Sequence, residues 1–202
     1  MRFCGRMCRV QQTEDHLPHH PDSATLQAGL ADVRRSPADH GVVELLVLRP
    51  AVDDRVVADA VMADLEHGIV GDTWLDRGNS RTADGAADPL AQVTVMNSRA
   101  ALLMAGSRER MPLAGDQIYL DLDLSVDNLP PGTVLDFGEA ALEVTAAPHT
   151  GCSKFAARFG VDALRLTADP DGRQLRLRGI NARVVRRGEI RAGSRVRVLR
   201  PQ

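Results

Sequence analysis

Short apolar segments separated by turn residues recur along most of the chain, and this pattern limits the fold more than any other feature. The segment 42–50 is a run of Val and Leu closed by proline, while 116–125 and 141–147 alternate apolar and polar residues. Gly188 and Gly193 divide the C-terminal part in the same way. Many short strands at close spacing are typical of barrels and sandwiches. We therefore expect a mainly β fold, a β-barrel with a few decorating helices.

Three helices are expected beside these strands. Asp22 or Ser23 can cap the first, which ends before Ser36-Pro37. Its apolar residues at helical spacing fall on one face: Leu26, Leu30 and Val33. A second helix is predicted over 97–105, with Asn97 or Ser98 as N-cap, and a third lies near 153–166 with a break at Gly160.

The same signals divide the chain into three parts. Residues 1–21 show no apolar periodicity, so we expect a flexible leader there. Residues 22–40 are predicted to form the short N-terminal helix and a linker. The barrel domain is expected over 41–200.

Charge and cysteine content exclude several classes of protein. With 25 basic and 27 acidic residues the net charge is −2, so there is no general electrostatic attraction to nucleic acid or to a membrane surface. No apolar run approaches the roughly 18 residues that a membrane span needs. Three cysteines do not form a disulfide framework, which favours a reducing, cytoplasmic location. The expected partner is a small-molecule substrate, without nucleic acid or membrane.

The segment PHTGCSKFAARFG, residues 148–160, contains the residues best suited to chemistry. If a helix begins just after Cys152, its free N–H groups favour a thiolate, the form in which sulfur reacts and binds metals. Lys154 and Arg158 are four residues apart, hence on one helical face, and His149 lies three residues upstream. The alternative is that Cys152 is a small buried apolar residue, a common environment for a free cysteine.

Other polar residues could hold the anionic part of a ligand. Arg176, Arg178 and Asn181 could bind phosphate or carboxylate, although alternating arginines are also common on a half-exposed strand. Thr94, Asn97, Ser98 and Arg99 lie at a strand-to-helix junction, a usual place for anions, but capping alone explains Asn97. Asp116 could orient a ligand, and its glycine neighbour favours a role in shaping a turn.

A cluster near the N-terminus invites a zinc interpretation. It consists of Cys4, Cys8, His16, His19 and His20. The segment has no apolar core around it, so we favour an unstructured stretch over a metal site.

These segments together resemble the MOSC domain, a module related to the C-terminal part of molybdenum cofactor sulfurase. The resemblance extends from about Val43 to Val198. It is most specific in Pro-His-x-Gly-Cys-x-Lys-Phe at 148–155, in Arg-Phe-Gly at 158–160 and in GIVGD at 68–72. It implies a MOSC-type β-barrel, with Cys152 corresponding to the cysteine proposed in that family to bind molybdenum or carry sulfur.

The resemblance also implies a function. A molybdenum-pterin cofactor would be held by Cys152 as metal or sulfur ligand, with basic and polar groups around it: His149, Lys154, Arg158, Asn97, Arg99, Arg178 and Asn181. The chemistry would be reduction of N-hydroxylated compounds, with a separate reductase, or sulfur transfer from a Cys152 persulfide. No pyridoxal-phosphate domain is expected within 202 residues, so a separate protein would generate the persulfide. The alternative is a non-catalytic carrier of cofactor or sulfur that serves a partner enzyme.

Overall fold

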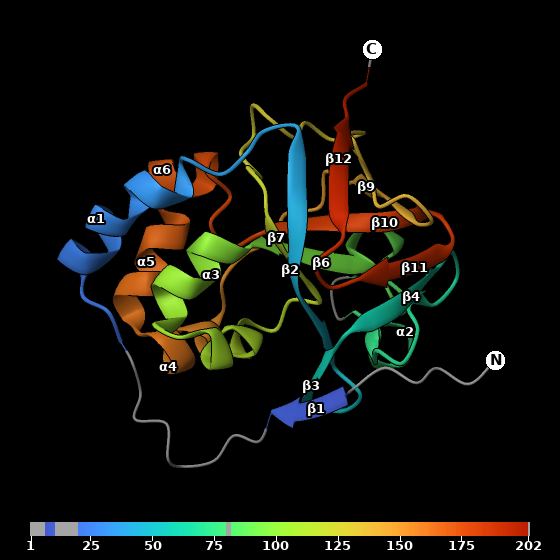
Figure 1. Ribbon diagram of the computed structural model, residues 1–202. Helices are drawn as coiled ribbons and strands as arrows, with labels where there is room; N and C mark the ends of the chain where they lie inside the picture. Colours follow the sequence, from blue (N-terminus) through green and yellow to red (C-terminus); the bar gives the residue numbers. More distant parts are fainter. Residues whose placement is uncertain (1–6, 11–19, 80–81, 202) are drawn as a thin grey trace.

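Seven strands close into a β-barrel in the computed structural model, which describes residues 7–10, 20–79 and 82–201 (Figure 1). Around the barrel the hydrogen-bonded order is β2 (His40–Leu48), β12 (Arg195–Leu199), β8 (Val134–Asp136), β9 (Ala141–Val144), β10 (Ile180–Arg186), β6 (Val93–Asn97) and β7 (Ile118–Asp121). Strand β7 pairs back onto β2 and closes the ring. Neighbours are antiparallel except β6 and β7, which are parallel. The expected mainly β barrel with decorating helices is confirmed.

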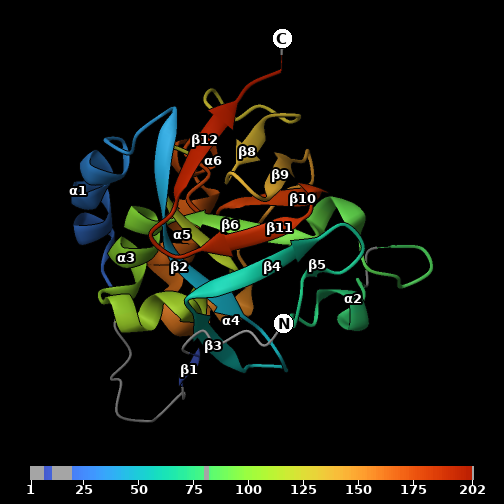
Figure 2. The same ribbon diagram turned by 45° about the vertical axis from the view of Figure 1, so that its right-hand side comes forward.

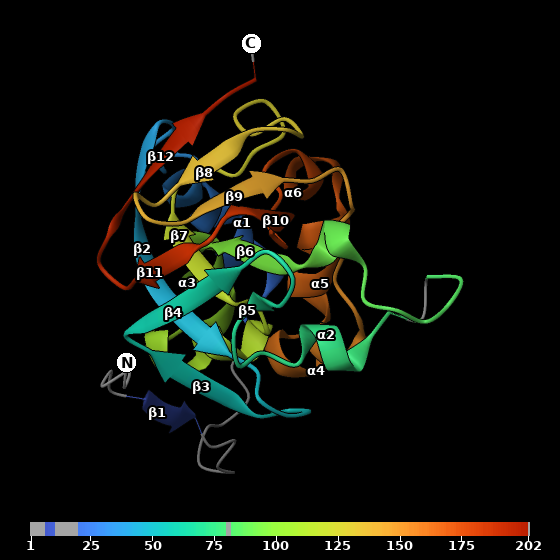
Figure 3. The same ribbon diagram turned by 90° about the vertical axis from the view of Figure 1, so that its right-hand side faces the viewer.

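Five further strands extend or flank the barrel. Strand β3 (Arg55–Ala58) continues the sheet from β2, and β1 (Met7–Val10) pairs antiparallel with β3. A separate three-stranded sheet contains β11 (Gly188–Arg191), β4 (Ala60–Asp64) and β5 (Gly68–Ile69). This sheet lies across the barrel on the side away from α1 (Figures 2 and 3). The N-terminal segment expected to be flexible thus includes a strand, while residues 1–6 and 11–19 lie outside the described part.

Most helices gather on one side of the barrel (Figure 1). This group comprises α1 (Ser23–Val33), α3 (Ser98–Ala105), α4 (Ser153–Phe159), α5 (Val161–Ala168) and α6 (Pro170–Gln174), with the 3-10 helix η2 (Arg108–Ala114). Helix α2 (Trp74–Arg77) and the 3-10 helix η1 (Pro89–Ala91) lie elsewhere on the chain, next to β5 and β6 in sequence. In α1 the predicted face is buried: Leu26, Leu30 and Val33.

Two apolar cores share the strands β6 and β7. Val95 and Ile118 point into the barrel core, while their neighbours Met96 and Tyr119 belong to the core beneath the helices. Because successive side chains of a strand point to opposite faces, these strands must be apolar at every position rather than at alternate ones. All five residues of β6 are buried. The barrel wall is therefore a partition between two cores.

Residues 175–178 form a turn, not the strand that their alternating arginines suggested. Asp169 caps α6 by accepting a hydrogen bond from Gly172 N at 2.6 Å, with Pro170 in the first helical turn. The chain then leaves the helix through turn hydrogen bonds donated by Arg176 N, Leu177 N and Gly179 N. Strand β10 begins only at Ile180.

Gly179 is the residue at which this turn meets the barrel. Its φ is +105°, and a Cβ built there would lie 2.3 Å from Val95 O, a backbone atom of β6. The positive φ strains any residue other than glycine. The contact excludes a side chain unless β6 moves. Gly193 has a similar φ of +80°, but nothing lies within 4 Å of its Cβ position.

These two glycines give a matched test of the contact. We expect Gly193→Ala to lower the free energy of unfolding by about 1 kcal/mol, the cost of the backbone conformation alone. Gly179→Ala should lower it by at least about 3 kcal/mol, because the collision with β6 adds to that cost. Chemical denaturation of both variants measures the difference, and equal losses would show that the approach to Val95 is unimportant.

Candidate functional site

Cys152 is exposed at the start of α4 and is not a buried core residue. It is the N-cap residue, with extended backbone angles of φ −135° and ψ 176°. The loop 145–151 leads from the end of β9 to this position. The thiol therefore lies where an irregular loop passes into a helix.

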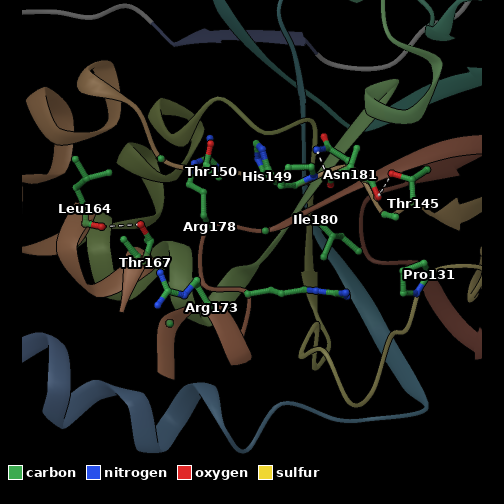
Figure 4. Close-up of a pocket in the computed structure, with 18 residues that line it drawn as sticks. Pro131, Thr145, His149, Thr150, Leu164, Thr167, Arg173, Arg178, Ile180 and Asn181 are labelled. Carbon is green, nitrogen blue, oxygen red and sulfur yellow. Dashed lines mark hydrogen bonds between the residues drawn. The ribbon is translucent and has the colours of Figure 1, made fainter. Parts of the chain in front are cut away.

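A pocket of about 410 Å³ opens beside that loop (Figure 4). The loop, α5, α6, the turn at 176–179 and the start of β10 all contribute to it. Its lining is Pro131, Thr145, Ala146, Ala147, Pro148, His149, Thr150, Gly151, Leu164, Thr167, Ala168, Gly172, Arg173, Arg176, Arg178, Gly179, Ile180 and Asn181. This lining includes three arginines and no carboxylate. The pocket is thus suited to an anionic ligand.

Gly151 allows the loop to pack closely against α5 next to the thiol. A Cβ at this position would lie 2.4 Å from Leu164 Cδ1, on the facing side of α5. Any side chain here would push into the lining or displace Leu164. The glycine that precedes Cys152 therefore fits a close packing of the loop against α5.

The innermost part of the site is a cluster around Asp116, whose side chain is completely buried. Its Oδ2 accepts a hydrogen bond from Arg178 Nη1 at 2.6 Å, and its Oδ1 lies 2.7 Å from His149 Nε2. Arg178 also donates to Ala114 O and lies over the ring of Phe155, 5.0 Å from its centroid. Sequence reasoning favoured a turn role for Asp116. The structure corrects this, because the carboxylate joins two pocket residues from distant segments.

The charges of this cluster shift the pKa values of its members. Burial alone would raise the pKa of Asp116, but Arg178 and His149 outweigh burial and hold that pKa below its ordinary value. Burial lowers the pKa of His149, and Arg178 lowers it further, against the opposing effect of Asp116. Asp116 is therefore ionised and His149 neutral near pH 7.

Of the other predicted residues, Arg178, Asn181 and His149 are brought together in the pocket. Asn181 is buried, and its Nδ2 donates to Ala147 O at 3.2 Å, which ties β10 to the loop before Cys152. Arg176 also lines the pocket, and its Nη1 donates to Leu129 O at 2.6 Å. Within the described residues no carboxylate pairs with Arg176 or with Arg173.

Lys154 and Arg158 share one face of α4, as their spacing predicts, and both contact Asp53 in the turn between β2 and β3. The Arg158 Nη2–Asp53 Oδ1 distance is 2.8 Å, and Lys154 Nζ lies 3.3 Å from the same carboxylate. Arg158 Nη1 also donates to Leu113 O. The Arg158 guanidinium is therefore held by Asp53 and Leu113.

Asn97 and Arg99 serve the fold at the start of α3 and do not line the pocket. Asn97 caps the helix by accepting from Ala100 N, and its Nδ2 donates to Ser36 Oγ and Leu122 O. Arg99 forms two hydrogen bonds to the carboxylate of Asp121. Capping of α3 accounts for Asn97 Oδ1, and the other two hydrogen bonds account for Nδ2.

Two features of the site were not foreseen in the sequence. Arg173 lines the pocket because it lies on α6, and no binding role was predicted for this residue. Arg49 and Asp72 form a buried pair, with Arg49 Nε 2.7 Å from Asp72 Oδ2, and Arg49 Nη1 donates to Gly115 O. This second pair fixes the residue next to Asp116.

The N-terminal cluster considered as a zinc site lies mostly outside the described residues. No group of three or more His, Cys, Asp or Glu side chains is placed to hold a metal among the described residues. Cys4, His16 and His19 lie outside those residues. Among the helices of the described chain, none is both long and apolar enough to cross a membrane.

The fold and the site define a class: closed β-barrel proteins with an exposed thiol beside an arginine-lined pocket. A family model described as the MOSC domain matches residues 73–197, more than half of the chain. The protein belongs to the MOSC domain family, which is associated with molybdenum cofactor binding.

Solved structures share the fold at low sequence identity. The YuaD protein from Bacillus subtilis is 17% identical with a TM-score of 0.62, and the match covers 81% of this chain and 97% of that one. YiiM from Escherichia coli is 18% identical with a TM-score of 0.52, and 80% of this chain and 71% of that one are covered. No curated protein sequence matches the chain. At these identities the similarity shows the fold alone.

The buried cluster predicts an acid-sensitive fold. The pKa of His149 lies below its ordinary value of 6.5 in the folded protein, so the unfolded chain binds this proton first as the pH falls. Stability is therefore lost below pH 6.5, by up to about 1.4 kcal/mol for each unit of pKa difference. The Asp116 contribution persists until the pH falls below 3.8, its ordinary pKa.

Urea denaturation at several pH values checks this expectation. His149→Gln should flatten the stability profile between pH 6.5 and 3.8. His40→Gln, at an exposed position of β2, is the control for the substitution itself. An unaltered slope in His149→Gln would contradict the assignment of a neutral, buried His149.

Proposed function

We propose that this protein binds a molybdenum-pterin cofactor in the arginine-lined pocket, with the thiol of Cys152 as ligand to the metal. The observation that carries this proposal is the position of an exposed thiol one residue beyond the lining of a cationic pocket. Thiolates are soft ligands that suit such metals, and arginines bind phosphate groups through paired hydrogen bonds. Association of the family with this cofactor supports the same conclusion.

The residues present fit such a group in size and charge. A volume of about 410 Å³ lies in the range of small-ligand pockets. Arg178 Nε is buried without a hydrogen-bond partner, which leaves one donor of the site unused within the described chain. Arg173 and Arg176 carry charges that no described carboxylate neutralises. These arginines would bind the anionic part of the cofactor, and Asn181 and His149 would contact its polar edge.

When bound, the cofactor would supply the redox chemistry, and the chain would orient it and set its surroundings. We propose reduction of N-hydroxylated compounds, with electrons from a separate reductase and a small molecule as substrate. Exposure of Cys152 also suits sulfur transfer, in which a separate protein would load a persulfide onto the thiol. A carrier without turnover remains the alternative of a different class. The proposed site does not include Lys154, Arg158, Asn97 or Arg99.

Cys152→Ser tests the ligand directly. Protein produced with molybdate should contain molybdenum by elemental analysis and release a fluorescent pterin after oxidation, and both signals should fall at least tenfold in the variant. The melting temperature should not change, because the side chain is exposed and serine keeps its shape. A cofactor content equal to that of the wild type would exclude Cys152 as the ligand.

Arg176→Met tests the anion-binding part of the pocket. Loss of one charge-assisted contact should weaken cofactor retention during gel filtration by about tenfold, the equivalent of about 1.4 kcal/mol. Arg165→Met is the matched control, because Arg165 lies on the adjacent α5 with an exposed side chain paired to Asp162. Equal retention by the two variants would argue against binding at Arg176.

Turnover then distinguishes an enzyme from a carrier. Cofactor-loaded protein with an added reductase should reduce an amidoxime, while an inactive but loaded protein would favour the carrier. Intact mass measurement detects a persulfide on the protein. A persulfide would distinguish sulfur transfer from the reductase and from the cofactor carrier.

A further inference from the structure

His149 has one ring nitrogen committed to the fold and the other free for chemistry. Asp116 is ionised and can only accept hydrogen bonds, so His149 Nε2 must carry the proton in the 2.7 Å contact. The neutral ring therefore has its lone pair on Nδ1. No hydrogen bond to Nδ1 exists among the described residues, and the ring lines the pocket (Figure 4).

Charge balance gives a second reason to assign chemistry to this histidine. Asp116 already has a full positive partner in Arg178, at 2.6 Å, so the carboxylate does not need His149 for neutralisation. A carboxylate that holds one imidazole nitrogen fixes the tautomer and stabilises the imidazolium that forms on protonation. A base oriented by such a third group is a recurring arrangement for proton transfer.

We propose that Asp116 and His149 form a proton-transfer dyad, in which Nδ1 of His149 takes a proton from an acidic O–H or N–H group of the ligand bound in the pocket. The ligand is left as its conjugate base, and the ring becomes an imidazolium whose Nε2–H stays on Asp116. No electron moves in this step, and the proton returns later to the product or to water. This role rests on the proposed function only for the identity of the ligand.

The surrounding charges make His149 a base rather than an acid at rest. Arg178 and, more distantly, Arg49 disfavour the imidazolium, and Asp116 favours it. Burial adds to the effect of the arginines, and the pKa of His149 lies below 6.5. A base in this range is unprotonated near neutral pH and still accepts a proton in a dry site.

The first test uses diethyl pyrocarbonate on the full chain without cofactor, because this reagent acylates unprotonated imidazole nitrogens. Peptide mass spectrometry should locate the modification on His149, with exposed His40 as the internal reference for reagent loss. Between about pH 8 and pH 6.5 the His149 rate should fall less than twofold, since a histidine of pKa 6.5 loses half its unprotonated form over this range. Failure to modify His149 in protein whose His40 reacts would overturn the proposal.

Nitrogen-15 spectra of the histidine rings give a second, independent readout. They should show His149 protonated at Nε2 and unprotonated at Nδ1 at neutral pH. The opposite tautomer, or a fully protonated ring, would exclude Nδ1 as the acceptor. Both experiments use cofactor-free protein, so their failure is distinguishable from a failure of the cofactor proposal.

A substitution separates proton transfer from a merely structural role. In His149→Gln the amide can still donate to Asp116, but it has no basic nitrogen. Turnover per bound molybdenum should fall at least tenfold with a melting temperature close to that of the wild type, and the acidic limb of the pH–rate profile should disappear. Normal turnover in this variant would show that the hydrogen bond alone matters and would overturn the dyad.

Discussion

The completely buried carboxylate of Asp116 is the interaction on which the site depends. It lies just before β7 and binds Arg178 from the turn before β10 and His149 from the loop before α4. A buried ion pair contributes little net stability, yet removal of one partner leaves an uncompensated charge that costs several kcal/mol. The three segments are thus held in one relative position. The pocket lies where these segments meet, and Cys152 is the residue after Gly151, which lines it.

The two-core architecture explains how that position is maintained. Strands β6 and β7 separate the barrel core from the core under the helices, so movement of α4 or α5 would disturb side chains such as Met96 and Tyr119 that belong to the wall itself. Phe155 and Phe159 anchor α4 in the helical core, with ring centroids 4.9 Å apart. An exposed thiol at the first turn of a helix can therefore be fixed in space although it is not itself packed.

Local patterns predicted the elements but not the partners of their charged side chains. The helix after Cys152 and the buried face of α1 follow from periodicity and capping, which depend on neighbouring residues. The strand expected over 116–125 forms only at Ile118–Asp121. Asp116 was interpreted as a turn residue because its partners are 33 and 62 positions away. The spacing of Lys154 and Arg158 correctly indicated one helical face, but nothing local indicated that Asp53 would occupy it. Arg176 and Arg178 alternate with leucines as residues of a strand do, but they lie in the turn that follows α6.

Because Arg178 pairs with Asp116, it adds no net positive charge to the pocket. Of its three arginines, Arg178 is neutralised by Asp116, and only Arg173 and Arg176 present charge to a ligand without a described carboxylate. Arg173 comes from α6 and Arg176 from the turn behind it, and Figure 4 shows Arg173 in a different part of the pocket from His149 and Asn181. An anionic group is therefore attracted to α6, while the Asp116 side offers a neutral imidazole and the amide of Asn181. A ligand with one charged and one protic end would be oriented by this difference, with its protic end toward His149.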